Sequence, residues 1–264
     1  MMEPLLVPMG APMRLDPVHE PDGHLLGQCF RLHQPASLEE LLSVYDDVPD
    51  GHRHLFTLDD LGQALYTAMH ASNRHDLDSG DWLQEAGIDA TWLEDGYPRD
   101  DLSLQQRLHI RRLGAERKLQ ETSFDDLFAK DLRVDEDSLA DLVAANTDLV
   151  SVLDDECYLL RIPVQRACEA IYGFANGYFS SDLSPQENFR LAEHLENHYG
   201  YALFGIGASL IAFRRSRALD QAQTASLLDL LSRLYAREDN GAPVRALFAD
   251  SIENRELLVL RYTE

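Results

Sequence analysis

The chain has 264 residues, 45% of them hydrophobic, so it can bury a substantial core in one large domain or two smaller ones. Its 46 acidic and 23 basic residues give a formal net charge of −23. A field of that sign repels nucleic-acid phosphates and anionic lipid surfaces and attracts basic partners. The composition therefore disfavours direct nucleic-acid binding and membrane association.

Residues 1–36 contain six prolines, a density that rules out a long helix. The only plausible strand among them is "HLLGQCFRL" (24–32), so we expect a Pro-rich arm with one possible strand. The first residues have neither a basic stretch nor a continuous apolar stretch of the kind found in signal peptides. No run of about 18 apolar residues predicts a membrane span. We therefore expect a cytoplasmic protein.

Residues 37–150 form the second predicted region, which is helical and acidic. Ser37, Thr57 and Ser103 each precede a segment with helical apolar periodicity, and each is a candidate helix N-cap. Shorter helices are predicted at 81–87, 123–132 and 137–146. Residues 151–264 carry a net charge of −5, which leaves −18 for residues 1–150. The acidity therefore belongs mainly to the first half.

Residues 151–264 are predicted to form an α+β domain. "CYLLRIPV" (157–164) is typical of a buried strand, and 164–175 of a helix. Ser184, Pro185 and Glu187 form a capping box for a helix that ends at Gly200. One or two strands over 201–215, helices over 218–237 and 243–250, and a strand over 256–262 follow. This order predicts an α+β fold with a C-terminal mixed sheet and helices packed on one face.

The stretch "SPQENFRLAEHLENHYGYALFGIG" (184–207), together with this order of elements, resembles a family of bacterial C-terminal α+β domains of unknown function. The resemblance covers residues 156–264. The final strand, which is rich in aromatic residues in that family, reads "ELLVLRYTE" here. The resemblance implies an α+β fold, and it implies no activity because the function of that family is unknown.

No complete catalytic motif is present. "HLENH" (194–198) matches neither of the zinc-protease patterns HExxH and HxxEH. "FGIGAS" lacks the third glycine of a dinucleotide-binding loop, and neither a P-loop nor a GxSxG motif occurs. Three cysteines without a CxxC pair are typical of small core residues. The sequence thus favours a binding protein over an enzyme and predicts no cofactor.

Two groups of histidines offer an alternative. His194 and His198 lie one helical turn apart and could coordinate one metal ion, but no third ligand lies on the same face of the predicted helix. We interpret them as half-exposed residues beside the buried stripe of their helix. The second group lies near Asp76 and Asp78, and its "GHRH" segment is typical of a solvated loop. This group comprises His52, His54, His70 and His75.

Residues 121–156 contain twelve acidic residues but only two basic ones, Lys130 and Arg133. They predict either an ordinary solubilising surface or a docking face for a basic protein. The basic run at 111–118 could pair with them. The candidate partner-binding residues are Asp125, Asp126, Asp131, Asp135, Glu136, Asp137 and Asp141.

The leading hypothesis is a cytoplasmic binding protein of the immunity or inhibitor type, whose acidic half engages a basic partner such as a bacterial toxin domain. One alternative is a metal-dependent enzyme or metal sensor that uses the histidines. Another is a nucleic-acid mimic, whose carboxylates would be spaced like phosphates.

Overall fold

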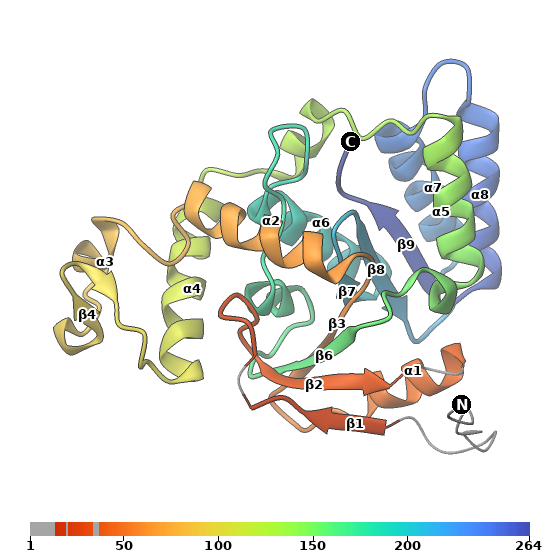
Figure 1. Cartoon of the computed structure of the whole chain (residues 1–264). Helices are drawn as coiled ribbons and strands as arrows, with labels where there is room; N and C mark the ends of the chain where they lie inside the picture. The colour runs from red at the N-terminus through yellow and green to blue at the C-terminus, as the bar shows by residue number, and fades with distance from the viewer. Residues whose placement is uncertain (1–13, 20, 34–36) are drawn as a thin grey trace, which may run out of the picture.

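The computed structural model describes residues 14–19, 21–33 and 37–264. Within these residues seven strands form one mixed sheet in the order β1-β2-β6-β3-β7-β8-β9 (Figure 1). The strands are β1 (Arg14–Pro17), β2 (Gln28–His33), β3 (Arg53–Thr57), β6 (Cys157–Ile162), β7 (Tyr201–Ile206), β8 (Leu210–Arg215) and β9 (Leu257–Arg261). β3 and β7 are parallel, and the other neighbours are antiparallel. The predicted α+β class is confirmed.

The helices are α1 (Leu38–Asp46), α2 (Leu61–Arg74), α3 (Trp82–Glu85), α4 (Leu104–Leu119), α5 (Glu136–Thr147), α6 (Pro185–Tyr199), α7 (Gln221–Tyr235) and α8 (Gly241–Asn254). Short 3-10 helices are η1 (Ala90–Trp92), η2 (Phe124–Ala129), η3 (Leu149–Val152) and η4 (Cys168–Gly173). A separate hairpin joins β4 (Leu93–Glu94) and β5 (Tyr97–Pro98). Among the described residues, no helix is long and apolar enough to cross a membrane.

The two faces of the sheet have separate cores. Along β8, Ile211 and Phe213 enter the main core, whereas Leu210 and Ala212 point to the other face, as strand alternation requires. Helices α2, α4, α6, α7 and α8 contribute to the main core. The second core is covered by α1 and η3. Helices therefore cover both faces rather than the single face predicted, with most of them on the main core and α1, η3 and Ala145 of α5 on the smaller one.

The N-terminal part of the chain contributes more to the sheet than the sequence predicted. Instead of one strand before residue 36 there are two, because β2 pairs with β6 and β1 pairs with the outer side of β2. β3 comes from the region expected to be helical, yet it lies between β6 and β7. The sheet is therefore not confined to residues 151–264. Four of the arm's prolines, Pro4, Pro8, Pro12 and Pro35, lie outside the described residues.

Three of the four predicted N-caps are confirmed. Ser37, Ser103 and Ser184 each accept a hydrogen bond from the backbone amide three residues later. Thr57 was wrongly expected to be an N-cap. It is the last residue of β3, where it pairs with β7, and the cap of α2 is Asp60. The predicted end of α6 at Gly200 is confirmed, since this glycine has the left-handed φ of 70°.

The prediction of a helix over 164–175 is also wrong, because only the 3-10 helix η4 forms there. Two carboxylates bind the backbone amides of the residues that lead into η4. Glu169 accepts from the amides of Gln165 and Arg166, and Glu196 accepts from those of Ala167 and Cys168. This segment therefore enters η4 as a tight turn anchored to α6.

The edge strand β9 is protected by a side chain of α5. The buried Asn146 side chain donates to the Val259 carbonyl at 2.8 Å and accepts from the Val259 amide at 3.0 Å. It also donates to the Leu142 carbonyl one turn earlier in its own helix. An uncovered edge would leave these backbone groups available to another strand. Asn146 thus fixes α5 to the sheet.

We predict that Asn146→Ala destabilises the protein by about 2–3 kcal/mol, because it leaves two buried backbone groups of Val259 without partners. Urea unfolding monitored by circular dichroism measures the change. Asn254→Ala is the matched control, since its side chain bonds only to exposed Asp250; a loss below about 0.5 kcal/mol is expected there. Equal effects of the two substitutions would contradict this role of Asn146.

Candidate functional site

The seven predicted partner-binding carboxylates are all exposed, but they are spread over η2, the connection that follows it and the start of α5. Asp125 and Asp126 lie on η2, which packs against α6 and α7. Asp131 lies in the connection that follows. The remaining four, Asp135, Glu136, Asp137 and Asp141, lie at the start of α5. The structure therefore places four of the seven on one helix and the others along the chain that leads to it.

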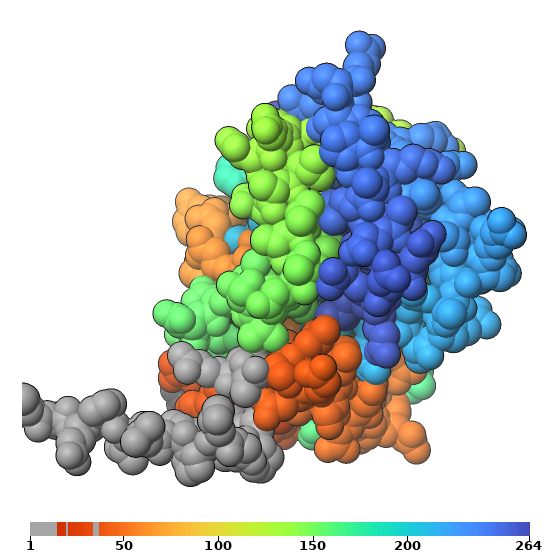
Figure 2. All heavy atoms as spheres, turned by 90° about the vertical axis from the view of Figure 1, so that its right-hand side faces the viewer, coloured from red at the N-terminus to blue at the C-terminus, as the bar shows by residue number. Residues whose placement is uncertain are grey.

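Helix α5 leaves most of its surface open. Only Leu142, Ala145 and Asn146 are buried. Figure 2 shows α5 beside α8 on an open face of the molecule. Val143 is 42% exposed and is one of the few large hydrophobic side chains on the surface. Its neighbours three and four residues away on the open side of the helix are the exposed Ala140 and Thr147. Ala140 and the exposed Ala144 separate it from the stripe of Asp137, Asp141 and Asp148. We call these residues, with Glu136, the α5 face.

Local hydrogen bonds engage two of the candidate carboxylates near α5. Arg133 donates to Asp131 at 2.9 Å, and this bond lowers the pKa of Asp131. Asp135 is the N-cap of α5, and the Ser138 amide that donates to it lowers its pKa. Both groups therefore remain ionised at neutral pH, but they also have local structural roles.

The basic run 111–118 does not pair with the acidic segment as the sequence suggested. Arg111 is buried and binds Asp78, and Arg112 pairs with Glu116 on its own helix. Arg117 lies over the Trp82 ring at 5.4 Å. Among the described residues, the arginines of this run therefore form their ion pairs with acids outside 121–156.

The predicted position of His194 and His198 beside the buried stripe of α6 is confirmed. Their rings stack with centroids 4.2 Å apart, and the Phe124 ring stacks on the other side of His194 at 4.0 Å. The Nδ1 atom of His198 lies 3.0 Å from the His194 carbonyl. Burial and the neighbouring His198 ring lower the pKa of His194 to about 4. The neutral ring of His194 is thus held in an aromatic stack.

The four N-terminal histidines do not converge. His54 lies in β3, where it is buried rather than in a solvated loop: its Nδ1 donates to the Val44 carbonyl and its Nε2 accepts from Arg161. His52 contacts the Asp50 carbonyl. His70 and His75 lie at the end of α2, His70 packing between Tyr66 and Tyr178 and His75 forming the C-cap. Within the described ranges no three His, Cys, Asp or Glu residues form a group that could hold a metal ion.

All three cysteines, Cys29, Cys157 and Cys168, are buried and unpaired. Burial raises the pKa of the Cys29 and Cys157 thiols to about 12. These thiols are therefore protonated at neutral pH and act as core residues, as the sequence predicted.

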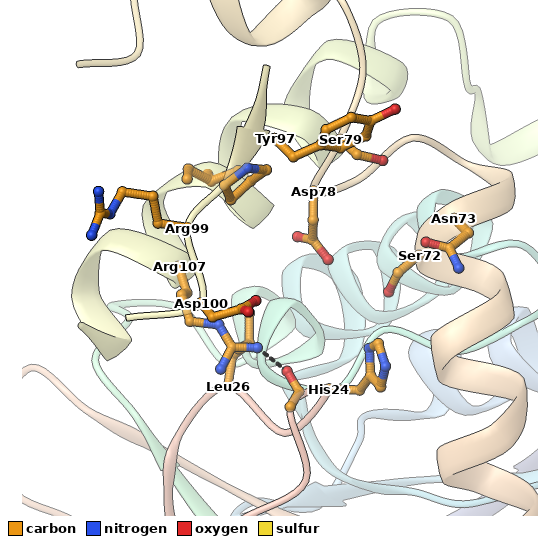
Figure 3. Close-up of a pocket in the computed structure, with 13 residues that line it drawn as sticks. His24, Leu26, Ser72, Asn73, Asp78, Ser79, Tyr97, Arg99, Asp100 and Arg107 are labelled. Carbon is orange, nitrogen blue, oxygen red and sulfur yellow. Dashed lines mark hydrogen bonds between the residues drawn. The ribbon is translucent and has the colours of Figure 1, made fainter. Parts of the chain in front are cut away.

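A cavity of about 390 Å³ brings together polar residues that the sequence did not single out. It lies beside the end of α2, the start of α4, residues 23–26 and the β4–β5 hairpin. Figure 3 shows Asp78, Ser72, His24, Asp100 and Arg107 around one hollow. These residues come from four separate segments and match no motif, so only the fold could reveal the site.

An ion pair between the buried Arg111 and the partly exposed Asp78 holds the wall of this cavity. The Arg111 side chain is 2% exposed, and its Nε donates to Asp78 Oδ1 at 2.5 Å, with a second contact from Nη2 to Oδ2. Gly114 allows this packing, because a Cβ there would lie 2.0 Å from the Leu77 carbonyl oxygen. Helix α4 can therefore approach the segment that carries Asp78.

Comparison with protein-family models, with curated proteins and with solved structures finds no match for this chain. The resemblance of residues 156–264 to a bacterial domain family therefore stays a prediction.

We predict that acid destabilises the protein through His194. Since its folded pKa of about 4 lies below the unfolded value of 6.5, the folded state binds fewer protons between these values, and stability falls as the pH drops from 6.5 to 4. His194→Gln removes this part of the dependence. Urea unfolding of both proteins at several pH values measures it; curves that stay parallel from pH 7 to 4 would contradict the prediction.

Proposed function

We propose that the protein is a cytoplasmic acidic binding protein of the immunity or inhibitor type. It engages a basic protein, such as a bacterial toxin domain, and does not catalyse a reaction. The α5 face is the centre of this binding surface, and the acids of η2 and the following connection extend it.

The observation that supports this proposal is the composition of the α5 face. Protein interfaces commonly combine an apolar centre with a polar rim. Here Val143, Ala140 and Ala144 supply exposed apolar surface, and Asp137 and Asp141 border it on the side of Ala140 and Ala144. Solubility alone explains the acids but not the exposed Val143 on the same open surface of α5.

Electrostatics would act mainly on the rate and selectivity of association. The net charge of −23 attracts a basic partner over a distance comparable to the Debye length. The first turns of α5 then supply carboxylates for individual ion pairs with lysine or arginine side chains. A partner held in this way dissociates as the salt concentration rises.

We predict that Asp137→Lys combined with Asp141→Lys weakens the complex by about tenfold or more, because it replaces attraction by repulsion at two positions. The wild-type protein serves as bait in a host extract at low salt, and captured proteins are eluted in salt steps. Affinity for the purified partner is then measured by calorimetry. Asp135 is kept, because it caps α5.

The matched control is Glu85→Lys combined with Glu94→Lys, two exposed acids near α3 that receive the same change of charge. It should retain most of the affinity. If both double variants weaken binding equally, only the total charge matters. That result would refute the proposal that the α5 face is the binding surface. Competition of the captured partner by duplex DNA would instead favour the nucleic-acid mimic.

A further inference from the structure

The cavity beside α4 is lined by an arginine that forms no ion pair at contact distance with any described carboxylate. Arg107 is partly buried, and its Nη2 donates to the Gly23 carbonyl. Arg111 lies near it, but the Asp78 carboxylate already pairs with Arg111. Throughout the described parts of the chain no carboxylate forms an ion pair with Arg107. A guanidinium that is partly desolvated beside another cation favours an anionic partner.

Two further polar groups at the cavity have no partner. Ser72 is 3% exposed, and its Oγ makes no hydrogen bond with any described residue. The same holds for the Nδ1 atom of His24. Figure 3 shows both side chains at the hollow that Asp78 and Arg107 also border. Buried polar groups are normally satisfied, so their convergence on one cavity indicates a polar ligand.

We propose that this cavity binds a small organic anion, whose carboxylate or phosphate group is held by Arg107 and whose hydroxyl groups bond with Ser72 and His24. Arginine suits this role, because its planar guanidinium can donate two parallel hydrogen bonds to either oxyanion. The site is separate from the α5 face, so the failure of one proposal leaves the other standing.

The place of the cavity in the fold suits a ligand site. Helix α3, η1 and the β4–β5 hairpin form a small lobe that projects from α4 (Figure 1). Its own core consists of Trp82, Leu83 and Ile88 packed on Ile110 of α4. The cavity lies where this lobe meets the main body, and Tyr97, 63% exposed, lies at its border. Ligand sites occur preferentially at such joints, and 390 Å³ is within their usual range.

The acidic groups around the cavity determine whether the ligand charge is favoured or opposed there. Asp78 is neutralised by Arg111, but Asp100 is exposed and also lines the cavity. Its charge opposes an anion and would favour a cation. Asp100→Asn should therefore tighten the binding of an anion, whereas it would weaken the binding of a cationic ligand.

Calorimetric titration of the full chain with succinate, and separately with inorganic phosphate, tests the proposal. We expect one of the two probes to bind with a Kd near about 1 mM, as befits a fragment of the ligand, and the probe that binds identifies the oxyanion. Arg107→Gln should weaken binding at least about tenfold, and Asp100→Asn should strengthen it severalfold. Arg112→Gln is the control on the same helix and should leave the Kd unchanged.

Ser72→Ala provides a second variant in case Arg107→Gln does not fold. It removes a hydroxyl without a partner, so the protein should remain at least as stable while the probe binds more weakly. The proposal is overturned if neither probe binds at about 10 mM. It is also overturned if Arg107→Gln, or Ser72→Ala where the first variant is unfolded, binds as the wild type does.

Discussion

The position of β3 in the middle of the sheet is the constraint on which the rest of the structure depends. On one side Leu55 pairs with Leu160 of β6, and on the other Phe56 pairs with Gly205 of β7. Without β3, the strands β1, β2 and β6 would form one sheet and β7, β8 and β9 another, each with an open edge. The two halves of the sequence therefore complete each other's core, although their charges differ strongly.

The same strand also positions the cavity. Directly after β3, the Asp59 carboxylate accepts from the amides of Ser209 and Leu210 at the β7–β8 turn. This anchor sets where α2 begins and thus where its last turn places Ser72. Asp78 follows a few residues later, and its ion pair with Arg111 fixes α4. The orientation of Arg107 toward the hollow therefore follows from contacts that begin at the centre of the sheet.

Sequence reasoning recovered the features that depend on neighbouring residues. The N-cap of α4, the capping box of α6, the end of α6 at Gly200 and the strands after residue 156 were found, because each carries a local signal. It missed β3, since "RHLFT" is short and begins with polar residues, and its buried state depends on β6 and β7, more than 100 residues away. The cavity was missed for the same reason: His24, Ser72 and Arg107 become neighbours only in the fold.

The net charge of −23 acts in opposite ways on the two proposed surfaces. At the α5 face it attracts a basic partner, and salt weakens that attraction. At the cavity the same field repels an anion, and only short-range contacts with Arg107 can overcome it. Figure 1 shows α5 and α4 on opposite sides of the molecule, so the two surfaces can be occupied together. Solubility alone does not require a partly buried arginine that forms no contact ion pair among the described residues, and Arg107 is therefore the residue on which the proposed anion site depends.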